Sequence, residues 1–163
     1  MIEIVNDVEE YQNSKQNFII NIVGLNEEFN EKTANQYPHV EKEYLRYLKY
    51  CSKNGINIIG SIQYVPVDTW ALIMCDTLKN NNVFAYDNDY QYIVNVYCPD
   101  GKITHKIVKI CFTEIAKTAR KIGATIAVPW AKGLYIKYSN IMMLFGKCRE
   151  LFEDIDVKIY SLN

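Results

Sequence analysis

The second half of the chain alternates between strand-like and helix-like segments, and this order limits the fold more than any other feature. Apolar β-type runs are expected at residues 92–98, 125–128 and 157–162, with amphipathic helices at 104–122 and 140–152 between them. Strands that alternate with helices are joined by right-handed crossovers and form a parallel sheet with helices on both faces. The sequence therefore predicts a three-layer α/β/α fold with a mixed, mostly parallel central sheet.

The first half of the chain predicts further strands. Residues 18–23 are apolar apart from Asn21, which is typical of a strand that is covered on both faces. Shorter β-type runs are expected at 2–5 and 58–67. Residues 68–82 fit either a buried strand or a short helix, so their conformation stays open at this point.

Two helices are expected between these strands. Acidic residues open the first, at 27–36, where they suit the positive end of the helix dipole, and Pro38 ends it. The second, at 40–53, carries apolar side chains at three- and four-residue intervals and stops at Asn54-Gly55.

The loops that follow the strands are the expected place for a site. Open α/β sheets bind ligands beyond the carboxyl ends of their strands. In this chain those loops span residues 24–28, 98–104 and 129–138. The glycines and polar side chains of these three segments are therefore the first candidates for binding.

Length and charge exclude several classes of protein. The chain has 163 residues, which suits one domain with one core. Its 18 basic and 19 acidic residues are interspersed and give a net charge of -1, so we expect neither general nucleic-acid binding nor a membrane-surface role. The chain start lacks a basic stretch followed by a long apolar one, which favours a cytoplasmic protein.

The five cysteines and two histidines form no metal-binding pattern. No pair of cysteines has the C-x-x-C spacing, so we expect reduced, mostly buried thiols and neither a metal nor a cofactor. Cys98 and His105 lie near the end of one expected strand. We favour a packing thiol and a histidine at a helix start over a nucleophile and its base. A catalytic pair needs a hydrogen-bond geometry that the sequence does not show.

Six segments carry a family resemblance when they are taken in chain order. They are Ile4-Val5-Asn6-Asp7-Val8, INIVGLNEEF at 20–29, Tyr37-Pro38, YIVNVYCP at 92–99, TIAVPWAKGL at 125–134 and DVKIY at 156–160. In this order they resemble the macro domains, ADP-ribose-binding α/β/α modules, in the style of the small bacterial and viral members related to terminal-ADP-ribose glycohydrolases. The resemblance spans residues 1–163 with an apparent insertion around 68–88, and it implies a single macro-like domain.

The resemblance implies a ligand site built from the first, second and fifth of these segments. In macro domains the acid that matches Asp7 binds the adenine amine, and the loops that match Gly24 and Gly133 hold the phosphates. Lys132 adds positive charge beside the second loop. The ligand-binding residues implied in this way are Asp7, Asn21, Gly24, Asn26, Lys132, Gly133, Leu134 and Tyr135.

Each of these residues also has a purely structural interpretation. Asp7 fits a helix cap or Asx turn as well as an adenine contact. Asn21 needs hydrogen-bond partners inside an apolar strand, and either a ribose or an internal network supplies them. Gly24 and Gly133 also fit ordinary turns, Lys132 also fits a solvated loop lysine, and Tyr135 also fits a packing residue.

The chain departs from the family pattern in the loops that would bind the ligand. Glu27 and Phe29 replace glycines whose backbone N–H groups approach the phosphates in the family. The family glycohydrolases also carry an acid after the second phosphate loop, where this chain has Tyr135-Ile136-Lys137. We therefore expect no efficient removal of ADP-ribose, and a ligand that is cyclic, less extended or differently charged.

The function expected is the binding of an ADP-ribose-type or other NAD-derived nucleotide. The richness in Ile, Lys and Asn is typical of AT-rich coding sequences, phages among them, and in a phage such a protein would sequester a nucleotide signal. Two alternatives stay open. One is an ADP-ribosyl hydrolase that removes ADP-ribose from a macromolecule, and the other is a catalytically dead pseudo-macro domain that acts as a protein-interaction module.

Overall fold

The computed structural model describes residues 2–25, 31–74, 89–98, 105–130 and 149–161. These residues form six strands, five α-helices and one 3₁₀ helix. In chain order they are β1 (Ile2–Val5), α1 (Val8–Gln12), β2 (Phe18–Val23), α2 (Glu31–Gln36), α3 (Pro38–Lys53), β3 (Ile62–Pro66), α4 (Thr69–Ile73), β4 (Tyr92–Tyr97), α5 (His105–Ile122), β5 (Ile126–Trp130), η3 (Arg149–Phe152) and β6 (Val157–Ser161).

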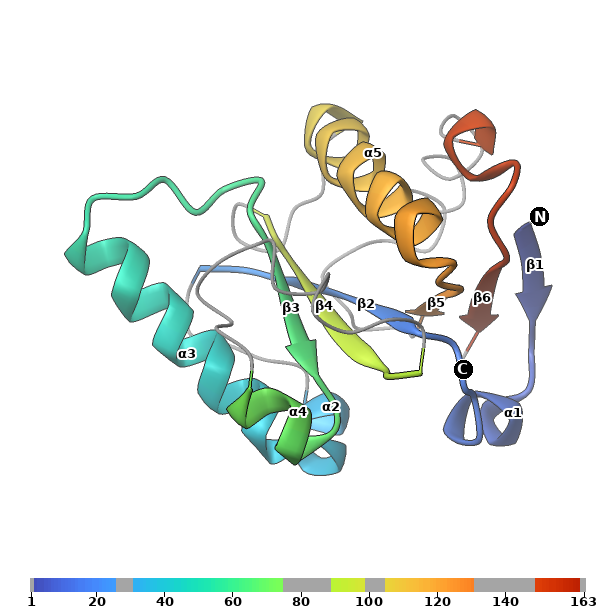
Figure 1. Cartoon of the computed structure of the whole chain (residues 1–163), viewed down its shortest axis with the longest axis horizontal. Helices are drawn as coiled ribbons and strands as arrows, with labels where there is room; N and C mark the ends of the chain where they lie inside the picture. The colour runs from blue at the N-terminus through green and yellow to red at the C-terminus, as the bar shows by residue number, and fades with distance from the viewer. Residues whose placement is uncertain (1, 26–30, 75–88, 99–104, 131–148, 162–163) are drawn as a thin grey trace.

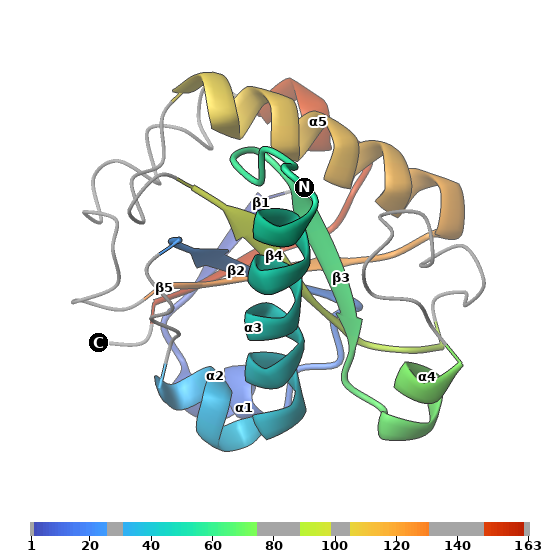
Figure 2. The same ribbon diagram turned by 90° about the vertical axis from the view of Figure 1, so that its left-hand side faces the viewer.

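The strands form one six-stranded sheet in the order β1-β6-β5-β2-β4-β3. The pairs β1–β6, β5–β6, β2–β5 and β2–β4 are parallel, and β3 runs antiparallel to β4 at one edge. Helix α5 and η3 cover one face of the sheet, whereas α1 to α4 lie on the other (Figures 1 and 2). The prediction of a three-layer α/β/α fold with a mixed, mostly parallel sheet is confirmed.

The sheet is buried on both faces, as the continuous apolar run of β2 predicts. Phe18 and Ile20 belong to the core under α5, where they lie with Cys111 and Ile115 of that helix. Ile19, one position along, faces the opposite way, into the core that includes Val40 of α3. Side chains that alternate along a strand thus fill two separate cores.

Proline and aspartate fix two helix starts. Pro38 follows α2 and is also the first residue of α3, so the second helix begins two residues before the expected 40. Proline is well tolerated there because the first helical N–H groups have no intrahelical partner. The conformation left open at residues 68–82 is known in part, because Thr69–Ile73 form helix α4. Asp68 caps the first turn of this helix by accepting a hydrogen bond from Ala71 N at 2.9 Å.

The structure corrects the expected boundary of β5. Pro129 and Trp130 were assigned to a loop by the sequence, but β5 continues through both, with Pro129 in register with Tyr160 of β6. Of the helix expected at 140–152, residues 149–152 form a 3₁₀ turn and the remainder lies outside the described residues. Helix α1 was not predicted at all.

Two further observations bear on the protein class. Among the helices that the structure describes, none has the length and apolar character needed to cross a membrane. Cys51, Cys98 and Cys111 are buried free thiols, as expected, and the remaining two cysteines lie outside the described residues.

Candidate functional site

The sheet opens between β2 and β5 at the carboxyl end of these strands. The ladder between them consists of Phe18↔Ile126 and Ile19↔Ala127, although β2 continues to Val23 and β5 to Trp130. On their other sides both strands stay paired over their full length, β2 with β4 and β5 with β6. The two central parallel strands therefore diverge towards the edge where the segments after Val23 and after Trp130 begin.

The amino ends of the same two strands are tied together. Asn17 N donates to Thr125 Oγ1 at 3.2 Å, and Thr125 N donates back to Asn17 Oδ1 at 3.0 Å. Phe18 N also donates to Thr125 O at 2.9 Å. The asparagine is buried, and its Nδ2 donates to Tyr90 O, just before β4, at 3.1 Å. These contacts hold β2 and β5 together at one end of the opening.

The opening also lies where the strand order reverses. From β2 the chain adds β4 and β3 on one side, and it later returns to add β5 and β6 on the other. Open α/β sheets bind ligands at this kind of switch point, because the loops after the two central strands leave in opposite directions. Topology and hydrogen bonding thus select the same place as the candidate site.

Asp7 follows β1 and caps α1. Its Oδ1 accepts hydrogen bonds from Glu9 N at 2.9 Å and from Glu10 N at 3.2 Å, and the side chain is exposed. The cap interpretation of Asp7 is therefore what the structure shows. A contact with an adenine amine stays a prediction, and the cap holds the carboxylate at the carboxyl edge of β1 where such a contact would occur.

Asn21 lies in a row of buried polar side chains that crosses three strands. Its Nδ2 donates to Asn95 Oδ1 at 2.9 Å, and Asn95 Nδ2 donates to Gln63 Oε1 at 3.1 Å. The same Gln63 oxygen accepts from the Tyr97 hydroxyl at 2.8 Å, and Gln63 Nε2 donates to Glu43 O of α3 at 3.1 Å. The internal network foreseen as one alternative for Asn21 is present. A ribose contact stays a prediction.

Gly24 directly follows β2 and is held by a tyrosine of an aromatic pair. Its carbonyl oxygen accepts a hydrogen bond from the Tyr44 hydroxyl at 2.9 Å, and the residue is buried. The Tyr44 ring stacks on Tyr97, with centroids 5.9 Å apart and an interplanar angle of 17°. Burial raises the pKa of Tyr97 far above its ordinary value, so its phenol stays protonated. The backbone that enters the first loop is therefore fixed by α3 and β4.

The remaining predicted binding residues lie outside the described residues. They are Asn26, Lys132, Gly133, Leu134 and Tyr135. Glu27 and Phe29 also lie outside the described residues. Because β2 and β5 are parallel, the segments after Val23 and after Trp130 begin at the same edge of the sheet. The structure thus brings the starts of the two loops to one edge.

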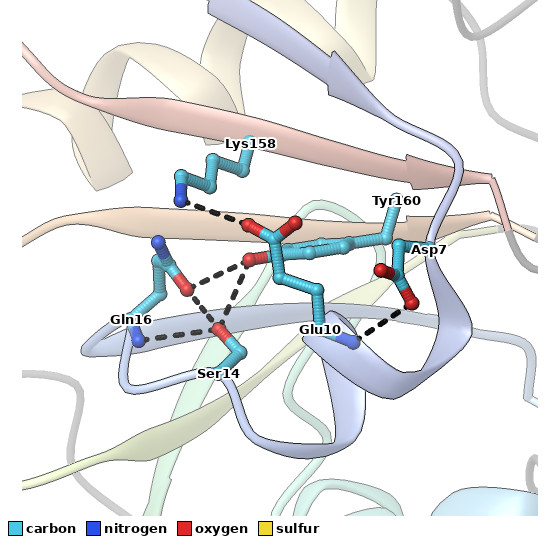
Figure 3. Close-up of polar contacts among 6 residues, drawn as sticks. All are labelled: Asp7, Glu10, Ser14, Gln16, Lys158 and Tyr160. Atoms are coloured by element: carbon cyan, nitrogen blue, oxygen red, sulfur yellow. Dashed lines mark hydrogen bonds and ion pairs between the residues drawn. The ribbon is translucent and has the colours of Figure 1, made fainter.

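A polar cluster behind Asp7 anchors α1 to β6, and sequence reasoning missed it (Figure 3). Lys158 Nζ lies 3.2 Å from Glu10 Oε1, and this contact raises the pKa of Lys158. The Tyr160 hydroxyl lies 3.0 Å from Gln16 Oε1 and 3.2 Å from Ser14 Oγ. The one sequence signal for this helix was Asp7 itself, a cap residue followed by two acids that suit a first helical turn.

The cysteine near the end of β4 lacks the properties of a nucleophile. Cys98 is fully buried, and burial together with the neighbouring Cys111 raises the pKa of its thiol to about 12. A reactive cysteine needs a thiolate at neutral pH. The packing interpretation of Cys98 is therefore favoured. No group of three or more His, Cys, Asp or Glu side chains suited to a metal ion occurs within the described residues.

No protein-family model matches the sequence, and no curated protein sequence matches it. Several solved structures, by contrast, superimpose on the chain. A macrodomain protein from Streptomyces coelicolor superimposes with a TM-score of 0.67 at 14% identity, with 100% of both chains covered. The macrodomain of Mycobacterium tuberculosis DarG gives 0.63 at 13% identity, again with 100% of both chains covered. The chain has a macrodomain fold.

A third structure with this fold contains a ligand. Thermosipho africanus DarTG, solved in complex with ADP-ribose, superimposes with a TM-score of 0.57 at 16% identity over 91% of this chain and 38% of that one. At such identities the likeness concerns the fold and not individual residues.

Proposed function

We propose that this chain binds ADP-ribose or another NAD-derived nucleotide in the opening between β2 and β5. The observation that carries the proposal is the divergence of these two strands at the switch point of a macrodomain fold. The ADP-ribose complex of Thermosipho DarTG, of which 38% superimposes on this chain, supports the ligand class. Exposed Asp7 and buried Gly24 lie at the carboxyl ends of β1 and β2.

The proposed roles follow the chemistry of each residue. Asp7 accepts a hydrogen bond from the adenine amine, and backbone N–H groups after Gly24 and beside Gly133 face the phosphates. Lys132 supplies the positive charge, and Asn26, Leu134 and Tyr135 complete the walls. Asn21 supports the site from inside the sheet, because its amide nitrogen is already bonded to Asn95.

We further propose that the protein retains its ligand instead of cleaving it. Glu27 and Glu28 bring two carboxylates to the loop after β2, which disfavours an extended pyrophosphate there. The segment Tyr135-Ile136-Lys137 offers no acid for hydrolysis. A cyclic or more compact nucleotide suits such a site, and sequestration of a nucleotide signal, as by a phage protein, is the corresponding biological role.

Calorimetry of the full chain against ADP-ribose and cyclic ADP-ribose tests the binding proposal. Lys132→Glu should abolish binding because it places a negative charge beside the phosphates. Lys117→Glu, the same charge change at an exposed site on α5, should leave the affinity unchanged. Equal affinities for Lys132→Glu and wild type remove Lys132 from the site, and no binding of any nucleotide overturns the proposal.

Incubation with ADP-ribosylated protein and ADP-ribosylated nucleic acid separates binding from hydrolysis. The proposal predicts binding without release of free ADP-ribose. Turnover that Asp7 or Lys132 substitutions abolish would instead establish the hydrolase alternative.

A further inference from the structure

An apolar groove runs along the second half of α3, beside the carboxyl edge of the sheet. It has a volume of about 790 Å³. Its lining residues, called here the α3 groove, are Leu25, Leu45, Leu48, Lys49, Cys51, Ser52, Lys53, Ile56 and Ile58. The core of the protein uses a different stripe of the same helix, namely Val40, Tyr44, Tyr47 and Cys51. Helix α3 is therefore apolar over a wider arc than the sheet requires.

The α3 groove combines apolar walls with positive charge. Leu45 and Ile56 are exposed although they are large and apolar. Lys49 and Lys53 are the charged lining residues, and neither forms an ion pair with any residue that the structure describes. Apolar walls with two lysines are complementary to a segment that carries apolar side chains and an acid.

Helix α4 presents such a segment on the surface of the same molecule. Trp70, Ile73 and Met74, called here the α4 ridge, are 72%, 75% and 68% exposed, whereas the next most exposed large apolar residue among those described, Ile110, is 51% exposed. Their spacing of three and four residues puts them on one side of a helix. The helix rests on the sheet through buried Ala71 and half-buried Leu72, and the exposed acid Asp68 begins it.

The ridge and the groove of one molecule lie at opposite ends of α3. Both views place α4 beside the first turns of α3, whereas the groove residues of that helix are in its last turns (Figures 1 and 2). The ridge therefore does not fill the groove of its own chain. A second copy of the chain can bring its ridge to it.

We propose that the α4 ridge of one copy docks in the α3 groove of a second copy. Trp70, Ile73 and Met74 enter between Leu45, Leu48 and Ile56, in the manner of a helix that lays its apolar face into a groove. Asp68 approaches Lys49 and Lys53, which supply the opposite charge. The contact joins two different surfaces, so it closes as a two-fold pair where each ridge reaches the groove of the other copy and continues head-to-tail where it does not. The idea is independent of nucleotide binding.

The interface is small, so the association is weak. Three side chains and one short helix bury less than the roughly 1,000 Å² that stable interfaces exceed. We expect a Kd on the order of 0.1 mM. A two-fold pair stops at the dimer, whereas a head-to-tail contact leaves one ridge and one groove free and gives larger species as the concentration rises.

Sedimentation of the full-length chain over a range of concentrations tests the proposal. The mean mass of wild type should rise above the 19.0 kDa of a monomer, whereas Trp70→Glu and Leu45→Glu should stay monomeric. Ile110→Glu, an equivalent exposed change on α5, should associate like wild type. If Leu45→Glu loses its circular dichroism spectrum, Ile56→Glu replaces it, because Ile56 is also exposed and lines the groove.

Mixing the two variants gives the decisive result. The Trp70→Glu copy keeps its groove and the Leu45→Glu copy keeps its ridge, so an equimolar mixture should form one-to-one pairs and stop there. A wild type that stays monomeric to millimolar concentration overturns the proposal. So does a mixture that forms no pairs, or an Ile110→Glu variant that loses association to the same extent.

Discussion

Asn21 and Asn95 face each other across β2 and β4, and their side chains form a hydrogen bond of 2.9 Å inside the sheet. Gln63 of β3 is in register with Asn95 and extends the row to a third strand. All three side chains are buried. The row belongs to the face of the sheet that α3 covers, since Gln63 reaches a carbonyl of that helix.

Removal of the central member of this row should destabilise the fold strongly. Asn95→Leu leaves the buried Asn21 Nδ2 without its acceptor, which costs about 1–3 kcal/mol, and removes one of the two hydrogen bonds that Gln63 Oε1 accepts. We expect a loss of about 2–4 kcal/mol in the free energy of unfolding, measured with urea. Asn21→Val combined with Asn95→Val should cost less than the sum of the two single changes, because the double variant strands fewer groups. Strict additivity would contradict the network.

The two roles of Asp7 can be separated by two substitutions. Asparagine is as good a helix cap as aspartate, whereas alanine loses about 1 kcal/mol at this position. Asp7→Asn should therefore keep the stability of wild type, and Asp7→Ala should lose about that amount in urea denaturation. Both should weaken nucleotide binding if the carboxylate contacts the adenine. Unchanged affinity in both variants would leave Asp7 as a cap alone.

Tyr160 should contribute to stability through its hydroxyl group. The side chain is buried, and its oxygen lies within hydrogen-bond distance of Gln16 and Ser14. Tyr160→Phe should cost about 0.5–1.5 kcal/mol, the usual range for one lost hydrogen bond. Glu10→Gln breaks the exposed ion pair with Lys158 and should cost less than about 1 kcal/mol. A larger loss for Glu10→Gln than for Tyr160→Phe would reverse this ranking.

Alkaline pH should weaken the fold through its buried thiols and phenols. Burial raises the pKa of Cys98 from 9.0 to about 12 and that of Cys111 to about 11. The unfolded chain therefore loses these protons first, and the stabilisation, complete below pH 9, decreases as the pH rises towards 11 and 12. Tyr11 and Tyr64, each raised from 10.0 to about 12, act in the same direction from pH 10 upward.

Urea midpoints measured between pH 8 and pH 11 check this expectation. The midpoint should fall with rising pH, and Cys98→Val should reduce the slope because it removes one of the linked groups. The same slope in Cys98→Val and wild type would exclude Cys98 as a contributor.

Local patterns were sufficient to predict most of the sheet, and their limits have physical causes. The run from Phe18 to Val23 signals a buried strand because it is short, rich in β-branched residues and apolar apart from Asn21. Helix α1 has five residues, too few for a periodic pattern, and its contact with β6 joins Glu10 to Lys158, 148 residues away. The partner of Asn21 is likewise 74 residues distant, so no local rule identifies it.

Pro129 was wrongly predicted to lie in a loop, and the reason for the error is a feature of the candidate site. A proline after an apolar run usually ends a strand because it lacks an N–H group. Here it stays inside β5 because β2 has already separated from that strand, so one side of β5 has no ladder to complete. Strand positions with a single paired neighbour tolerate proline. The same residue that suggested a loop thus marks the opening.

The hydrogen bonds between Asn17 and Thr125 join β2 and β5 at their amino ends, whereas the two strands separate towards their carboxyl ends. The part of β2 that is not paired with β5 runs from Ile19 to Val23 and is about 13 Å long at ~3.3 Å per residue. A small rotation of β2 with its partner β4, relative to β5 and β6, is therefore largest at the carboxyl ends of the strands, where the loops begin. In the proposed site, the width available to a ligand depends in part on Asn17 at the opposite end of the sheet, so we expect a change of Asn17 to alter selectivity although every contacting residue stays the same.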